Sequence, residues 1–152
     1  MFCLSFRAGD EEKLDTSYKR VHLYGSMRLK ERHEDGVTIF ALSGAIDLHY
    51  VPTLRSLFQS RLKERCPALI VDLSEVDFID STGLATLIEY HRDAGAHGGI
   101  FCLAGINPNL KAIFDVVQFE KVLAIFPTVA EAKAAIKTGR VRLYLADEPA
   151  AS

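Results

Sequence analysis

The segment at residues 77–84, Asp-Phe-Ile-Asp-Ser-Thr-Gly-Leu, holds the side chains best suited to chemistry in this sequence. An apolar run precedes it and an amphipathic pattern follows it, which predicts a strand, a turn and then a helix that starts after Asp80. A hydroxyl at such a helix start is exposed, and a phosphate attached to it is stabilised by the free N–H groups of the first turn. The plainer interpretation is that Asp80 or Ser81 only caps the helix.

Gly83 points beyond simple capping. A glycine in the first turn of a helix costs about 1 kcal/mol relative to alanine, so it predicts that some group comes close to the backbone there. An acid, two hydroxyls and a glycine in a row are also more than a cap requires. Binding sites of open α/β sheets collect at the carboxyl ends of the strands. We therefore expect a binding surface around Asp80, Ser81, Thr82 and Gly83.

Familiar catalytic and metal-binding patterns are absent from the sequence. It contains no Gly-x-Ser-x-Gly, no phosphate-binding glycine loop and no His-Glu-x-x-His. The five histidines are not spaced like metal ligands, and His91 falls on an apolar helix stripe, which is typical of a partly buried core residue. The three cysteines, Cys3, Cys66 and Cys102, form neither a disulfide framework nor a zinc pattern. We expect no cofactor and no metal ion, and a reducing, cytoplasmic location.

Alternating strand and helix patterns must position the expected surface. A hairpin turn at residues 34–36 separates two β-rich runs, and each later strand is followed by a helix. The expected strands are residues 26–32, 37–42, 68–73, 100–103 and 122–126. The expected helices begin at Val51, after the 80–83 turn, at Pro108 behind an Asn107 cap, and at Val129 behind a Thr128 cap. This order predicts an α/β fold, with a small mixed, mostly parallel sheet packed with about four helices.

The length of 152 residues corresponds to one ordinary domain. We expect a charged extension at residues 1–25, partly mobile or only loosely docked, then the domain at residues 26–138 and a tail at residues 139–152. Within the tail, residues 141–145 alternate between apolar and polar side chains, and this segment could add an edge strand or dock on a partner.

Composition narrows the class of partner. Hydrophobic residues make up 49% of the chain, which excludes full disorder. Lys plus Arg is 18 and Asp plus Glu is 20, so the net charge of −2 argues against nucleic acid and against anionic membrane surfaces. No apolar stretch approaches the roughly 18 residues that span a bilayer, and we expect no signal peptide and no membrane insertion. The remaining partners are proteins and small molecules.

The sequence resembles the STAS domain family, in particular bacterial anti-sigma factor antagonists. The resemblance is strongest at residues 71–73 and 76–84, which are similar to the family's phosphorylation segment. Weaker similarities follow in the family's order: Gly-Ala-Ile-Asp at residues 44–47, Gly98-Gly99, Asn107-Pro108 and Ile113-Phe114. Together they cover about residues 26–138. One departure is Ala45, where many members of the family carry an acidic residue.

The resemblance implies a binding switch and not an enzyme. Unphosphorylated members bind an anti-sigma factor, which is also a serine kinase, and so release the sigma factor. The kinase phosphorylates the antagonist with ATP, and a metal-dependent serine phosphatase reverses the step. The implied acceptor is Ser81, with Thr82 as the second candidate. The implied partner-binding residues are Asp47, Asp80, Ser81, Thr82, Gly83 and Leu84. The charged extension and the tail exceed the family's minimal domain and could serve dimerisation or a different partner, so a homodimer stays open.

Two other interpretations stay open at this point. The first is a STAS subunit that docks on a lipid or anion transporter complex, where the same helix start would be a passive docking surface. The second is a small enzyme or nucleotide-binding domain of the doubly wound type. Its only support is the 80–83 turn, and the absence of a phosphate-cradling glycine loop counts against it.

Overall fold

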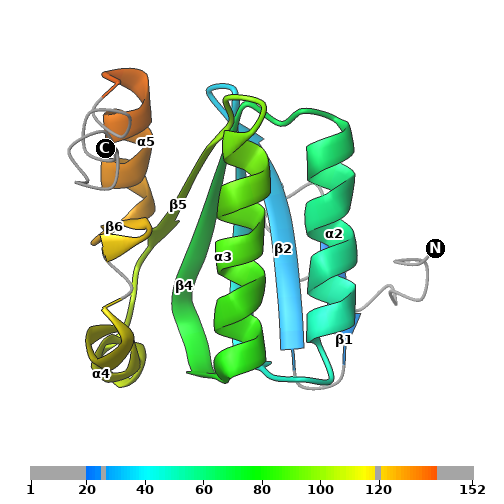
Figure 1. The fold of residues 1–152 in the computed structure, drawn as a ribbon, viewed down its shortest axis with the longest axis vertical. Coiled ribbons are helices and arrows are strands. Elements are labelled where there is room, and N and C mark those ends of the chain that lie inside the picture. The colour runs from blue at the N-terminus through cyan, green and yellow to red at the C-terminus, as the bar shows by residue number, and fades with distance from the viewer. Residues whose placement is uncertain (1–19, 25–26, 119–120, 140–152) are drawn as a thin grey trace.

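The structure is a computed structural model that describes residues 20–24, 27–118 and 121–139, with the backbone alone at residues 20–24 (Figure 1). Six strands form one sheet in the order in which they occur along the chain. They are β1 (Arg20–Tyr24), β2 (Met27–Glu34), β3 (Val37–Ile46), β4 (Ala68–Ile79), β5 (Ile100–Ala104) and β6 (Ala124–Phe126). The helices of the described residues are α2 (Val51–Lys63), α3 (Ser81–Gly95), α4 (Pro108–Val117) and α5 (Val129–Lys137).

The sheet is mixed, as the sequence predicts. Strands β1, β2 and β3 pair antiparallel, and β3 through β6 pair parallel. The turn between β2 and β3 places Asp35 at φ 54° and Gly36 at φ 78°. Two successive left-handed residues suit a tight hairpin between right-twisted strands. The expected turn at residues 34–36 and the α/β fold class are therefore confirmed.

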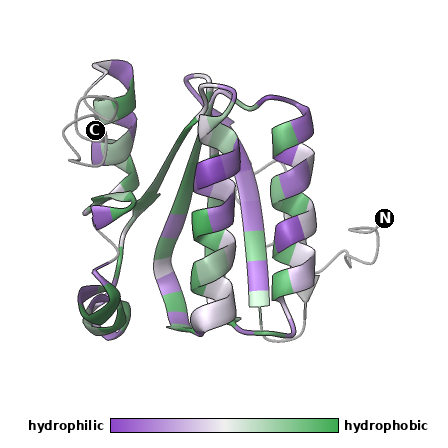
Figure 2. Cartoon of the chain, in the orientation of Figure 1, coloured by the Kyte–Doolittle hydropathy of each residue, from purple (hydrophilic) through white to green (hydrophobic). Residues whose placement is uncertain are grey.

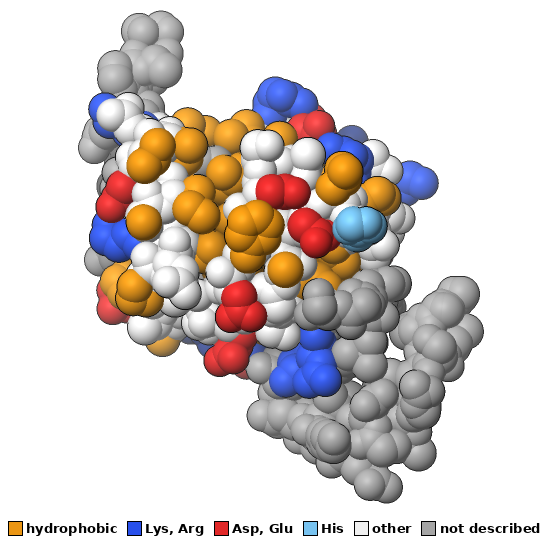
Figure 3. All heavy atoms as spheres, turned by 90° about the horizontal axis from the view of Figure 1, so that it is seen from below, with side chains coloured by type: hydrophobic (Ala, Val, Ile, Leu, Met, Phe, Trp, Pro, Cys, Tyr) orange, Lys and Arg blue, Asp and Glu red, His pale blue; other side chains and the backbone are white. Residues whose placement is uncertain are grey.

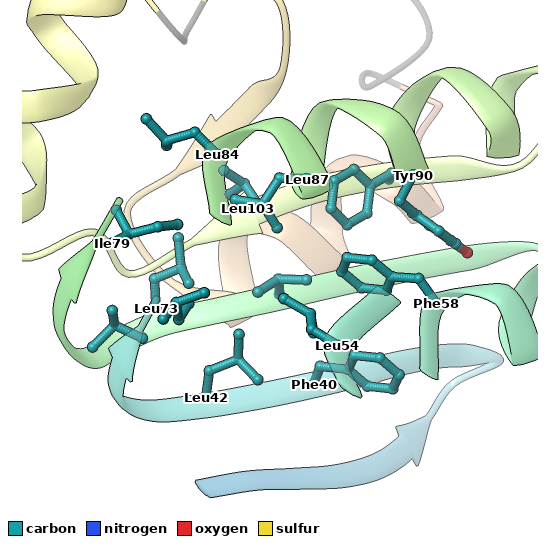
Figure 4. Packing of buried hydrophobic residues seen from close by; sticks show 14 of the residues in the cluster. Phe40, Leu42, Leu54, Phe58, Leu73, Ile79, Leu84, Leu87, Tyr90 and Leu103 are labelled. Atoms are coloured by element: carbon teal, nitrogen blue, oxygen red, sulfur yellow. The ribbon is translucent and has the colours of Figure 1, made fainter. Parts of the chain in front are cut away.

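Two apolar layers hold the helices on the two faces of the sheet. Helices α2 and α3 cover one face, where Phe58 and Tyr90 lie 4.7 Å apart between ring centroids and Tyr90 and Phe101 lie 4.9 Å apart (Figure 4). Helix α5 covers the β4–β6 half of the opposite face with Ala132 and Ala135, both fully buried. Strand β5 lies between the two layers and contributes alternate side chains to each of them. It is hydrophobic along its length (Figure 2).

Strands β3 and β4 are longer than the sequence predicts. Strand β5 stops pairing with β4 at Asp72, but β3 and β4 continue together to the pair Ile46 and Ile79. Two register shifts, the second after Gly44 at φ 95°, accompany this extension. The two strands thus project beyond the parallel sheet as a ribbon that carries the residues before α3. A nearly continuous apolar run marks only the first half of each strand, because that half is buried on both faces whereas the second half is partly exposed.

Strand β1 was not expected from the sequence, which placed residues 1–25 in an extension. Residues 20–24 pair antiparallel with β2, from Arg20 opposite Glu31 to Tyr24 opposite Met27. An edge strand is held by backbone hydrogen bonds, so it needs no apolar alternation. Strand β6 is shorter than expected and begins at Ala124. The segment 141–145 lies outside the described residues.

Candidate functional site

Asp80 joins two parts of the chain at the carboxyl end of β4. Its backbone N–H donates to the Ile46 carbonyl at 3.2 Å, and its carboxylate Oδ2 accepts from the Leu48 N–H at 3.1 Å. The turn between β3 and α2 is thereby attached to the start of α3. The candidate site consists of this turn, the end of β4 and the first turn of α3.

The same carboxylate caps α3. Its Oδ1 accepts from the Gly83 N–H at 2.9 Å and from the Thr82 hydroxyl at 2.5 Å. The Thr82 hydrogen bond is the main reason that the pKa of Asp80 lies below its usual range, with help from the Gly83 and Leu48 N–H groups and against a cost of partial burial. Asp80 is therefore ionised at neutral pH. The helix-cap interpretation is confirmed for Asp80.

The two hydroxyls at this helix start differ in environment. Thr82 is half-buried and its hydroxyl is engaged by Asp80. Ser81 is exposed, and within the described part of the chain its hydroxyl makes no hydrogen bond. Ser81 therefore presents the accessible hydroxyl of the pair, at the positive end of the helix dipole.

Gly83 allows close packing between α3 and the ends of β3 and β4. A Cβ there would lie 2.7 Å from Ile79 Cγ1 and 2.9 Å from Ile46 Cγ2, so only glycine lets α3 pack this closely on the ends of β3 and β4. The expectation that a group comes close to the backbone at Gly83 is confirmed, and the groups that do so are the protein's own Ile46 and Ile79. Leu84 is also in the core, at 9% exposure. Gly83 and Leu84 therefore support the candidate site from the side of the hydrophobic core.

Asp47 lies in the adjoining turn. Its Oδ1 accepts from the His49 N–H at 3.0 Å, and the His49 ring Nδ1 lies 3.6 Å from the same oxygen. Its side chain is 40% exposed. Asp47 therefore shapes the turn and still presents a carboxylate beside Leu48, whose backbone Asp80 holds.

Two residues that the sequence did not single out are prominent on this surface. Leu48 is 63% exposed and Phe78 is 47% exposed, although both are large and apolar. Phe78 pairs with Ala45 in the β3–β4 ribbon and precedes Asp80 by two residues. Viewed from this end of the molecule, apolar side chains gather with acidic side chains among them (Figure 3). No Lys or Arg occurs in the sequence between Arg65 and Arg92, so this region is anionic as well as apolar.

Exposure of Leu48 and Phe78 could not be predicted from their types alone. In β4, Val76 and Ile79 are buried whereas Asp77 and Phe78 are exposed, so the alternation of a regular strand breaks at this point. The only sequence signal is that each of these large apolar residues directly follows an acid, Asp47 before Leu48 and Asp77 before Phe78.

The remaining chemistry of the described residues is sparse. No group of three or more His, Cys, Asp or Glu within residues 20–24, 27–118 and 121–139 could hold a metal ion. His91 is half-buried beside Phe101, and burial lowers its pKa, as expected for a core histidine.

A hollow of about 420 Å³ between α4 and β6 is lined mainly by apolar side chains, and Lys111 on its edge is paired with Asp115 at 3.1 Å. Among the helices that the structure describes, none has the length and apolar character needed to cross a bilayer.

The fold and the site together define a class of protein: a small α/β domain that presents an exposed serine at a helix start, on an apolar and acidic surface. Comparison with known proteins agrees. The STAS domain family model matches residues 28–132, so the chain belongs to the STAS domain family.

Relatives of this chain within the family are named as anti-sigma factor antagonists. The chain is 24% identical over 102 residues to the anti-sigma F factor antagonist of Paenibacillus polymyxa, and the alignment covers 66% of this chain and 87% of that protein. A crystal structure of an anti-sigma factor antagonist from Mycobacterium paratuberculosis superposes with a TM-score of 0.68 at 28% identity, covering 74% of this chain and 95% of the other. Anti-sigma factor antagonists are regulators that act by binding and not enzymes.

The fold also occurs in transporters. The STAS domain of a SulP transporter from Vibrio cholerae superposes with a TM-score of 0.56 at 22% identity, covering 71% of this chain and 86% of that domain. This likeness concerns the fold alone.

Proposed function

We propose that this protein is an anti-sigma factor antagonist in a partner-switching pathway, with Ser81 as the phosphorylation site. In its unphosphorylated form it binds an anti-sigma factor that is also a serine kinase, and the sigma factor is released. The observation that carries the proposal is the contrast between the exposed, unengaged Ser81 hydroxyl and the Thr82 hydroxyl held by Asp80. Such a partner implies a cytoplasmic regulator.

Phosphorylation transfers the γ-phosphoryl group of ATP to Ser81 Oγ, which loses its proton as ADP leaves. The phosphoserine adds about −1.5 to −2 charges. The start of α3 tolerates this charge because the helix dipole and the first-turn N–H groups favour an anion there. The fold therefore survives the modification, and a serine phosphatase can remove the phosphate by hydrolysis.

The same charge disrupts docking. The new phosphate lies beside the ionised Asp80 and on a surface that already carries Asp47 and Asp77. A partner surface shaped for a neutral hydroxyl leaves the phosphate buried without a counter-charge. Burying an unpaired charge in an interface costs roughly 3–5 kcal/mol. One modification thus switches binding off without unfolding the domain.

The test compares the full chain with its Ser81→Ala and Thr82→Ala variants. We expect the cognate kinase to transfer labelled phosphate to wild type and to Thr82→Ala, but not to Ser81→Ala. We also expect unphosphorylated Ser81→Ala to bind the anti-sigma factor as wild type does. Equal labelling of Ser81→Ala and wild type would overturn the site, and a wild-type chain that binds no anti-sigma factor would overturn the function.

A transporter-docking subunit is the second candidate, because the fold likeness to the STAS domain of a SulP transporter supports it and the exposed Leu48 and Phe78 would anchor such a complex as well as an anti-sigma factor. Purification of the tagged chain from its own cells discriminates the two. Recovery with a membrane transporter complex, together with no phosphate on Ser81, would support docking. Recovery with a soluble kinase would support the switch.

A further inference from the structure

A cluster of polar side chains lies in the core where the last turn of α2 meets β2. Arg61 of α2 is 6% exposed, and its Nη1 donates to Oε2 of Glu31 on β2 at 2.7 Å. Its Nη2 donates to Oε2 of Glu64 at 3.1 Å, on the solvent side of the cluster. Two carboxylates therefore face one guanidinium, so the positive charge of Arg61 is already matched.

Two buried polar atoms lack a hydrogen-bond partner at this place. They are Nε of Arg61 and the hydroxyl oxygen of Tyr90 on α3, and no group of the described residues pairs with either atom. Tyr90 is 2% exposed, so bulk water does not reach the hydroxyl freely. Buried polar groups of folded proteins are almost always paired with a protein group or with an ordered water molecule. The two orphan donors therefore indicate a bound molecule.

The two atoms point into the same region. The ring of Tyr90 lies 4.7 Å from that of Phe58 between centroids, and its hydroxyl extends past Phe58 on the side away from Leu54 (Figure 4). Arg61 follows Phe58 by three residues, so it lies on the same face of α2, about one turn further in that direction. Burial and the nearby Cys66 raise the pKa of Tyr90, whereas the charge of Arg61 lowers it, so the hydroxyl and the guanidinium interact.

The packing beside Tyr90 leaves room for a small molecule. A hollow of about 20 Å³ lies between α2 and α3, and Tyr90, Phe58 and Leu62 border it. A space of roughly 10–15 Å³ is enough for one water molecule. The exposed Gln59 and Asp93 also line the hollow, so it opens to solvent. Water therefore has a route to Tyr90 between the two helices.

The chemistry of the two atoms selects water as the ligand. The Nε–H of Arg61 can only donate, whereas the hydroxyl of Tyr90 can donate or accept. A water molecule accepts the N–H and exchanges a further hydrogen bond with the hydroxyl. An anion fits less well, because Glu31 and Glu64 already match the charge of Arg61 and a buried unmatched charge is costly.

We propose that one ordered water molecule binds between Nε of Arg61 and the hydroxyl of Tyr90, and joins α2 to α3 inside the core. Ser81 is the first residue of α3, and Tyr90 lies about two and a half turns further along that helix. The water site is thus separate from the candidate functional site. It does not depend on phosphorylation of Ser81 or on the identity of the partner.

A crystal structure of the full chain, at a resolution that shows ordered water, is the direct test. We expect a water peak within about 3.2 Å of both Nε of Arg61 and the hydroxyl oxygen of Tyr90. A structure in which both atoms bond to protein groups, or in which no peak lies between them, would overturn the proposal. Crystals grown in bromide test for an anion, and an anomalous peak at the site would overturn it as well.

Tyr90→Phe tests the water in solution through the sign of its effect on stability. If the hydroxyl binds a water molecule, its removal costs a hydrogen bond, and we expect the unfolding equilibrium constant to rise roughly fivefold. If the hydroxyl has no partner, its removal relieves the burial of an unpaired polar group. Urea unfolding at pH 7 measures the constant, and a variant as stable as wild type or more stable would contradict the proposal.

Arg61→Lys tests whether the two residues share the water. Lysine keeps a positive charge for Glu31 but has no N–H group at the place of Nε. We expect Tyr90→Phe to have an effect at least about twofold smaller in the Arg61→Lys background than in wild type, because the bridge is then already broken. An equal effect in both backgrounds would show that no water bridges Arg61 and Tyr90.

Discussion

The Asp80 carboxylate accepts the Leu48 N–H at 3.1 Å with one oxygen and caps α3 through Gly83 with the other. One side chain thus couples the turn before α2 to the helix start that presents Ser81. The exposed Leu48 and the exposed Ser81 are consequently held in a fixed relation, which is what a binding surface assembled from two separate segments requires.

The first prediction concerns this coupling. Asp80→Ala removes the acceptor of the Thr82, Gly83 and Leu48 hydrogen bonds, and we expect the free energy of unfolding to fall by about 1–2 kcal/mol. Asp80→Asn keeps a capping oxygen and should lose less. Urea unfolding at pH 7 measures both variants. An alanine variant as stable as wild type would show that the Asp80 hydrogen bonds contribute nothing to the free energy of unfolding.

The second prediction concerns pH. The pKa of Asp80 is lower in the folded protein than its usual value near 3.8 because ionised Asp80 accepts the Thr82 hydroxyl and two N–H groups. Its ionisation therefore stabilises the fold above about pH 4, and this contribution is lost as the pH falls through the folded-state pKa. We expect the stability difference between wild type and Asp80→Asn to shrink toward zero as the pH falls from 7 to 2.5. Glu34, whose pKa is also lowered, changes equally in both proteins. A difference that stays constant with pH would contradict the prediction.

The third prediction compares two glycines of α3. Gly83→Ala forces a Cβ within 3 Å of Ile79 and Ile46, and we expect a loss of about 1–3 kcal/mol from overpacking. Gly95→Ala, at the exposed end of the same helix, meets no atom within 4 Å and should be neutral or stabilise by up to about 1 kcal/mol. Thermal unfolding of the two variants decides the matter. Equal effects at both positions would remove the packing argument for Gly83.

The fourth prediction concerns the apolar anchors. Phe78→Ala and Leu48→Ala remove exposed apolar surface, so the fold should keep its stability while binding of the anti-sigma factor weakens at least about tenfold, or roughly 1.4 kcal/mol. Val116→Ala is the control, because Val116 is 82% exposed and lies on α4, a helix that contributes no residue to the candidate site. Calorimetric titration with the unphosphorylated protein measures the three affinities. Equal weakening by Val116→Ala would show that general hydrophobicity, and not this surface, drives binding.

The family motif and the helix caps could be predicted because they depend on local chemistry. Asn107 and Thr128 cap α4 and α5 as their sequence patterns indicate, each accepting an N–H three residues later at 3.1 Å. The edge strand β1 and the full length of β3 and β4 could not be predicted in this way. Those residues owe their conformation to backbone pairing with a neighbouring strand, and backbone pairing by itself leaves no pattern in the side chains.

The sequence alone determined the α/β order, the resemblance to the family and the place of the candidate site at residues 77–84. These follow from periodicity, capping residues and a contiguous motif, all of which are properties of neighbouring residues. Only the tertiary structure decided the separate roles within that segment. Ser81 is exposed, Thr82 is held by Asp80, and Gly83 packs against Ile46 and Ile79. The reason is that Ile46 and Leu48 approach the segment from more than thirty residues away, and such a contact determines which side chain remains available to a partner.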